Sequence, residues 1–72
     1  MKHLYFKHAN GEFSFVAANV GEESDGYIQI LIAKHCKKIN PNYKIPYFNR
    51  HMDILGRIWY DIGSETEEYV VF

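Results

Sequence analysis

The chain has 72 residues, the size of one small domain. Its hydrophobic content of 47% and aromatic content of 17% are too high for a disordered chain, so we expect a packed core. Lysine and arginine number 8 against 9 acidic residues, giving a net charge of -1. This balance provides neither the basic field of a protein that binds nucleic acid through phosphates nor the acidity of a DNA mimic.

Cys36 is the single cysteine, so an internal disulfide is excluded and a reducing compartment is favoured. The N-terminus carries a charge or imidazole every few residues, unlike a signal peptide, and no apolar stretch approaches ~18 residues. We find no internal repeat, low-complexity tract or linker. The sequence therefore predicts one cytoplasmic domain over residues 1–72 that does not cross a membrane.

A first hairpin is predicted by Asn10-Gly11, which favours a two-residue type I′ turn because both central residues of that turn need a positive φ. The turn places the apolar residues of both flanking strands on one face. It pairs His8 with Phe13, Phe6 with Phe15 and Leu4 with Ala17. The opposite, partly exposed face then contains His3, Tyr5, Lys7, Ser14, Val16 and Ala18.

A helix is predicted by apolar residues at helical spacing, namely Ile28, Leu31, Ile32, Cys36 and Ile39. Two starts are compatible with the pattern: a capping box of Asn19 and Glu22, or a later cap at Ser24 or Asp25. Asn40-Pro41 ends the helix. We treat the next segment, residues 42–55, as irregular, because Pro46 restricts a strand to a sheet edge and residues 48–55 are equally compatible with a short helix.

Residues 56–72 contain two aromatic and β-branched runs on either side of a polar turn, which predicts a final hairpin. Strand alternation gives the same two faces for a loop of two or four residues. One face holds Ile58, Tyr60, Ile62, Tyr69 and Val71, and the other holds Arg57, Trp59, Asp61, Glu68, Val70 and Phe72.

Together these elements predict an α+β fold in ββαββ order, with an antiparallel sheet of two hairpins and one helix packed on one face. The path of residues 42–55 and the choice of the covered face stay open. The expected core is Leu4, Phe6, Phe13, Phe15, Ile28, Leu31, Ile32, Ile58, Tyr60 and Tyr69.

The histidine and cysteine residues do not form a zinc-binding pattern. His35 and Cys36 are adjacent on the helix and point about 100° apart, while His3 and His8 lie on opposite faces of one strand. Of the possible nucleophiles, Cys36 is expected in the core, and Ser64 is typical of a turn. We therefore expect no metal, no cofactor and no enzymatic activity.

Two groups of charged residues are candidate sites. The acidic group of Asp61, Glu65, Glu67 and Glu68 surrounds the last turn without calcium-loop spacing, so we interpret it as a solvated rim or a contact to a basic partner. The basic group of Lys34, Lys37 and Lys38 is typical of a helix C-terminus.

Trp59 is the strongest candidate for a contact surface. Alternation separates it from the face of Tyr60, so Trp59, Val70 and Phe72 are expected to form an exposed apolar group, edged by Arg57, Asp61 and Glu68. Two alternatives remain: residues 43–55 cover this group, or the faces are reversed and Trp59 lies in the core.

The ending from Ile58 to Phe72 resembles the aromatic-Asp-x-Gly-Ser-x-Thr-Glu-aromatic ending of small uncharacterised proteins encoded by bacteriophages and mobile elements. The succession of hairpin, lysine-ended helix and hairpin is also similar to small phage-encoded inhibitors of host proteins, anti-CRISPR proteins among them. Such inhibitors cover a surface of their target. The resemblance implies an inhibitor of a host protein, without the DNA mimicry of strongly acidic members.

We therefore expect a non-enzymatic cytosolic module that docks a sheet face or edge on a host protein or on a second copy of itself. One alternative is a nucleic-acid-binding module, which would use Tyr5, Tyr60 or Trp59 as stacking platforms with Lys2, Lys7 and Arg57 nearby. Near-neutral charge disfavours this alternative. Another is a homodimeric structural protein.

Overall fold

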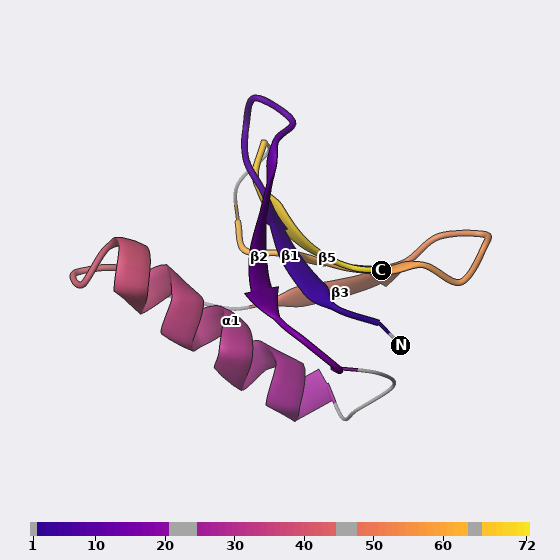
Figure 1. Ribbon diagram of the computed structural model, residues 1–72, viewed down its shortest axis with the longest axis horizontal. Coiled ribbons are helices and arrows are strands. Elements are labelled where there is room, and N and C mark those ends of the chain that lie inside the picture. Colours follow the sequence, from indigo (N-terminus) through magenta and orange to yellow (C-terminus); the bar gives the residue numbers. More distant parts are fainter. Residues whose placement is uncertain (1, 21–24, 45–47, 64–65) are drawn as a thin grey trace.

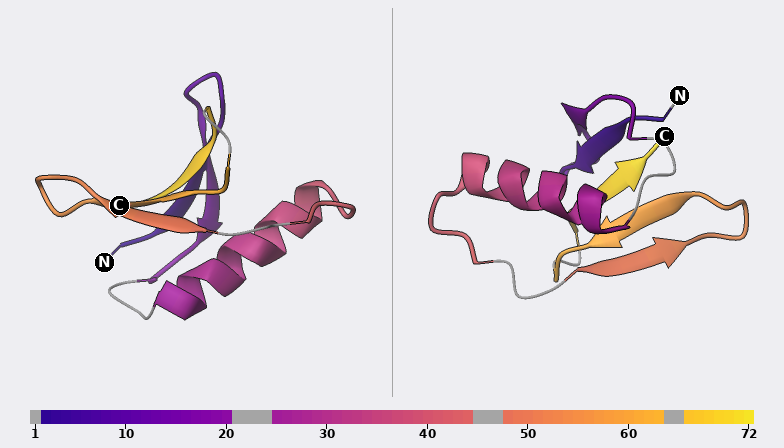
Figure 2. Two further views of the ribbon diagram at one scale, coloured as in Figure 1. Left: turned by 180° about the vertical axis from the view of Figure 1, so that it is seen from behind. Right: turned by 90° about the horizontal axis from the view of Figure 1, so that it is seen from below.

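The computed structural model describes residues 2–20, 25–44, 48–63 and 66–72. Within them the chain order is β1 (Leu4–Lys7), β2 (Phe13–Ala17), α1 (Asp25–Ile39), β3 (Asn49–Met52), β4 (Ile58–Asp61) and β5 (Glu68–Val71). The strands form one antiparallel sheet in the order β2-β1-β5-β4-β3. The helix α1 lies across one face of this sheet (Figures 1 and 2). The α+β class predicted from the sequence is confirmed.

The predicted ββαββ order lacks one strand. Residues 49–52, inside the segment treated as irregular, form β3 and pair with β4, where His51 lies opposite Trp59. β3 is an edge strand with the sequence Asn-Arg-His-Met. An edge strand with one neighbour needs no alternating apolar pattern, and this one is nearly all polar, so periodicity does not reveal it.

The predicted register of the first hairpin is wrong by one residue. The loop has three residues, because the His8 N–H donates to the Glu12 carbonyl at 2.8 Å and the Gly11 N–H donates to the His8 carbonyl at 2.9 Å. Only Gly11, with φ of 89°, needs the left-handed conformation. The Asn10 side-chain oxygen also accepts the Glu12 N–H at 2.9 Å, which supports this longer turn.

The longer turn moves the aromatic residues of β2 to the other face of the sheet. Phe15 pairs with Tyr5 and Ser14 pairs with Phe6, in place of the predicted pair of Phe6 and Phe15. As a result Phe13 and Phe15 are 49% and 60% exposed and do not belong to the core. An irregularity beside Leu4 then restores the predicted pairing of Leu4 with Ala17.

The core lies between α1 and the sheet. Six of the predicted core residues are buried there: Leu4, Phe6, Ile28, Ile32, Tyr60 and Tyr69. Leu31 and Ile58 are partly buried against them. The core also includes Val20, Cys36, Ile62 and Val71. The predicted division of the last hairpin into two faces is confirmed, because Tyr60 pairs with Tyr69 and Trp59 pairs with Val70.

The helix α1 presents Ile28, Ile32 and Cys36, one turn apart, to the sheet, whereas Ile39 is exposed. The structure describes the helix from Asp25 onward; Glu22 of the predicted capping box and Ser24, a predicted later cap, lie outside the described residues. At the other end, the Asn40 N–H donates to the Cys36 carbonyl at 3.0 Å before Pro41. Among the described helices, none has the length and apolar character needed to cross a membrane.

Candidate functional site

The sheet face opposite α1, here called the open face, carries a row of mostly aromatic side chains across all the described strands. Phe15 of β2 lies opposite Tyr5 of β1, which lies opposite Val70 of β5. Val70 in turn lies opposite Trp59 of β4, and Trp59 lies opposite His51 of β3. Directly opposed residues point to the same face. We call these residues the cross-strand row.

An aromatic cluster forms one end of the cross-strand row. The Tyr5 ring lies 5.9 Å from the rings of both Phe15 and Phe72, measured between centroids, and Phe13 lies 5.7 Å from Phe72. His3 joins the cluster edge-on, 6.0 Å from Phe15. These tilted and edge-to-face geometries are favourable for aromatic pairs. The cluster therefore orders side chains that lie largely on the surface.

A stacked pair forms the other end of the row. The rings of His51 and Trp59 are 3.9 Å apart and nearly parallel, with an interplanar angle of 12°. This stack holds the indole against the sheet, and Trp59 is only partly exposed. The buried His51 Nε2 has no hydrogen-bond partner within the described part of the chain. Between the two ends, the prediction of an exposed Val70 is wrong: it is only 8% exposed, because large side chains flank it on both neighbouring strands.

The residues predicted as a contact surface come together on this face. Five of them line a depression of about 290 Å³: Arg57, Trp59, Glu68, Val70 and Phe72. The sixth, Asp61, lies opposite Glu68 in the β4–β5 pair. The face of Tyr60 meets the helix as expected, so the alternative of reversed faces is wrong. The alternative of a cover by residues 43–55 holds in part: His51 stacks on Trp59, whereas Tyr43 and Phe48 pack against the core.

Charges along the open face are arranged in pairs of opposite sign. Lys7 Nζ lies 3.6 Å from Glu68 Oε1, and Arg57 Nε donates to Asp53 Oδ2 at 2.6 Å. The Asp53 pKa is lowered, mainly because its carboxylate accepts the Arg57 backbone N–H and further because it accepts the Arg57 side chain. The Asp61 carboxylate accepts the Gly63 N–H at 2.6 Å. Lys7 and Arg57 are therefore both paired with carboxylates of the same chain.

The acidic group predicted around the last turn is divided by the sheet. Glu68 and Asp61 are on the open face, whereas Glu67 lines a different cavity beside the helix. Glu65 lies outside the described residues. Within the described ranges, no three His, Cys, Asp or Glu side chains are placed to hold a metal ion.

Sequence reasoning missed the tip of the β3–β4 hairpin, where Ile54 is 100% and Leu55 is 72% exposed. The turn repeats the geometry of the first hairpin: the Gly56 N–H donates to the Asp53 carbonyl at 3.0 Å, and Gly56 has a φ of 78°. Asp53 Oδ1 also accepts the N–H groups of Leu55 and Arg57 at 2.8 and 2.9 Å. The spacing of Asp53 and Gly56 was the available signal for this turn.

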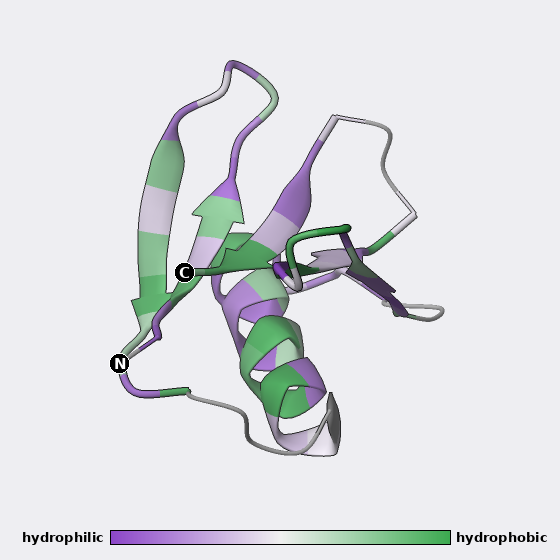
Figure 3. Cartoon of the chain, turned by 90° about the vertical axis from the view of Figure 1, so that its right-hand side faces the viewer, coloured by the Kyte–Doolittle hydropathy of each residue, from purple (hydrophilic) through white to green (hydrophobic). Residues whose placement is uncertain are grey.

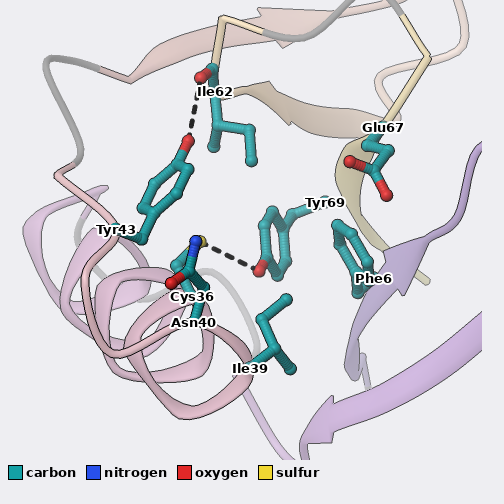
Figure 4. Close-up of a pocket in the computed structure, with 8 residues that line it drawn as sticks. All are labelled: Phe6, Cys36, Ile39, Asn40, Tyr43, Ile62, Glu67 and Tyr69. Atoms are coloured by element: carbon teal, nitrogen blue, oxygen red, sulfur yellow. Dashed lines mark hydrogen bonds between the residues drawn. The ribbon is translucent and has the colours of Figure 1, made fainter.

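The covered face contains a small cavity of about 280 Å³ between α1, Tyr43 and the sheet (Figure 4). The Tyr69 hydroxyl contacts Cys36 Sγ at 3.2 Å and His35 Nδ1 at 2.8 Å, and the Tyr43 hydroxyl donates to the Ile62 carbonyl at 3.4 Å. Burial raises the pKa values of Cys36 and Tyr69. Cys36 is thus a buried, protonated thiol, as expected from the sequence, and a poor nucleophile.

Of the serine nucleophiles, Ser64 lies outside the described residues. Ser14 Oγ lies 2.6 Å from His8 Nε2, a contact of the kind that activates a serine. A contact between a serine and a histidine supplies two of the three members of a catalytic triad.

Three comparisons with known proteins do not identify this chain. No family model, curated protein or solved structure matches it.

Proposed function

We propose that this chain is a protein-binding module without catalytic activity, and that the open face is its contact surface. The observation that carries the proposal is the cross-strand row, which extends over five strands and is flanked by charges already paired within the chain. An apolar centre with a polar rim is typical of protein interfaces. The partner surface should accordingly be apolar at its centre, with few charges of its own.

The phage resemblance supports a host protein as the partner and inhibition by surface coverage as the mode of action. Trp59 supplies the large, rigid aromatic side chain that such contacts favour. The tip residues Ile54 and Leu55 add exposed apolar side chains at the turn between β3 and β4, which Asp53 fixes. A tip ordered in advance loses less conformational entropy on binding.

A pull-down from the natural host followed by affinity measurement on the captured protein tests this proposal. Trp59→Ala should weaken binding by about 30-fold, equivalent to ~2 kcal/mol, while retaining a cooperative melt and the parent circular dichroism spectrum. Ile30→Ala is the matched control, because Ile30 is an exposed apolar residue on the opposite side of the molecule. Equal losses in both variants, or none in either, would contradict the proposed surface.

Nucleic-acid binding is a second candidate, favoured by the exposed rings of Phe13, Phe15 and Phe72, since single-stranded bases stack on such platforms. Tyr60, one of the predicted platforms, is buried under the helix and does not contribute. The Lys7 and Arg57 charges are paired with acids, which lowers the attraction for phosphates. A salt titration with mixed single-stranded oligonucleotides separates the two: steeply salt-dependent binding supports this candidate, and no binding at low salt removes it.

A further inference from the structure

β2 is an edge strand with a free side. Its neighbour is β1, and no described element lies beyond it (Figure 3). Its sequence, Phe-Ser-Phe-Val-Ala, contains neither a charge nor a proline. Natural proteins usually protect sheet edges with such residues, because an unprotected edge readily pairs with another strand. The edge is therefore a place where this fold can accept a further strand.

The outward backbone groups of this edge belong to the two exposed phenylalanines. The His8 N–H donates to the Glu12 carbonyl, so the backbone of Glu12 faces β1. Because backbone direction alternates along an antiparallel strand, Ser14 also faces β1, while Phe13 and Phe15 direct their N–H and carbonyl groups outward. Their side chains lie on the open face and belong to the aromatic cluster.

We propose that two copies of this chain dimerise by antiparallel pairing of their β2 strands about a twofold axis. In the proposed register, Phe13 of one copy lies opposite Phe15 of the other. The outward N–H and carbonyl groups of these two residues then bond to each other across the dimer. It joins the two aromatic clusters into one surface. This inference goes beyond the proposed function and does not depend on it.

The distribution of charged residues favours a second copy of this chain as the partner of the β2 edge. At the β2 edge, self-pairing brings no like charges together, because the strand carries none. At the opposite edge, self-pairing of β3 would place Arg50 close to its own copy, which is unfavourable. The irregularity near Leu4 and Ala17 shortens the regular part of the β2 edge, so we expect a weak dimer that forms at high protein concentration.

Sedimentation equilibrium and amide hydrogen exchange over a concentration series test the dimer together. The expected result is a monomer–dimer equilibrium in which the amides of Phe13 and Phe15 become protected as the dimer forms. This measurement uses the unmodified chain, so it does not depend on the folding of any variant. A monomer at every concentration, or a dimer in which both amides exchange as fast as in the monomer, would overturn the proposal.

Phe15→Lys adds a charge in each copy beside the axis, which passes between the two Ser14 residues, and should raise the dimer dissociation constant by about tenfold or more. Ile30→Lys places the same charge on the exposed side of α1 and should leave dimerisation unchanged. Trp59→Ala should also retain the dimer, because Trp59 lies three strands away from β2. If Trp59→Ala loses partner binding but retains the dimer, the proposed function and the proposed dimer are separated. An unchanged dimer dissociation constant in Phe15→Lys would contradict the proposed dimer.

Discussion

Tyr5 lies directly opposite Phe15 across the first hairpin, with 5.9 Å between the ring centroids, on the sheet face that α1 does not cover. A two-residue turn would have placed Phe15 opposite Phe6 in the core. One additional residue in the turn therefore converts two core candidates, Phe13 and Phe15, into members of a surface cluster. Both the proposed contact face and the proposed dimer edge depend on this difference.

Paired alanine substitutions measure this register directly. Phe6→Ala should destabilise the fold by about 3–5 kcal/mol, because Phe6 is buried between α1 and the sheet. Phe15→Ala should change the free energy of unfolding by no more than about 1 kcal/mol, because its side chain is mostly exposed. Chemical denaturation of both variants at low protein concentration provides the comparison. Similar large losses would place Phe15 in the core after all.

The stack of His51 on Trp59 should be visible in fluorescence, since Trp59 is the single tryptophan. His51→Ala removes the ring that covers one side of the indole. We expect the emission maximum to move to longer wavelength and the stability to fall by about 0.5–1.5 kcal/mol. His3→Ala, on the same face but at the other end of the row, is the control and should leave the emission maximum in place.

The Tyr69 hydroxyl should contribute measurably to stability. Tyr69→Phe keeps the ring but leaves His35 Nδ1 and the Cys36 thiol without this partner in a buried setting. The expected cost is about 1–2 kcal/mol. Tyr5→Phe is the matched control on the open face, and we expect it to be nearly neutral in the same denaturation experiment. An equally neutral Tyr69→Phe would show that the hydroxyl contacts carry no net free energy.

Stability should decrease in mildly acidic solution because of His35. Burial lowers its pKa below the usual 6.5, and the charges of Lys38 and His8 add to this effect. The unfolded chain then binds a proton more readily than the folded chain, so the stabilisation is complete above about pH 6.5 and is lost as the pH falls through the folded-state pKa. Denaturation between about pH 5 and pH 7.5 should show this slope, and His35→Gln should reduce it.

The hairpin tip should depend on Asp53, whose carboxylate accepts two backbone N–H groups and the Arg57 side chain. Asp53→Ala should loosen the turn and speed amide exchange at Leu55 and Arg57, while the core amides of β5 remain protected. If the tip contributes to partner binding, Asp53→Ala also weakens that binding even though both tip side chains are retained. Unchanged exchange at Leu55 would show that Gly56 alone fixes the turn.

Several features of this protein are determined by the sequence alone, because they follow from short-range periodicity. The spacing of Ile28, Ile32 and Cys36 requires a helix with one apolar face, and the structure confirms it. Strand alternation separates Trp59 from Tyr60, and any loop with an even number of residues places Val70 and Phe72 on the face of Trp59. The expected grouping of Trp59, Val70 and Phe72 with their charged neighbours followed from that parity.

Other features were decided by the tertiary structure, because they depend on a choice of register or on contacts between distant segments. Asn10-Gly11 is compatible with turns of two or three residues, and each choice sends Phe13 and Phe15 to a different face. β3 is nearly all polar, so only its pairing with β4 makes it a strand. The cross-strand row exists because β1 pairs with β5, far apart in sequence, and joins the two hairpins into one sheet.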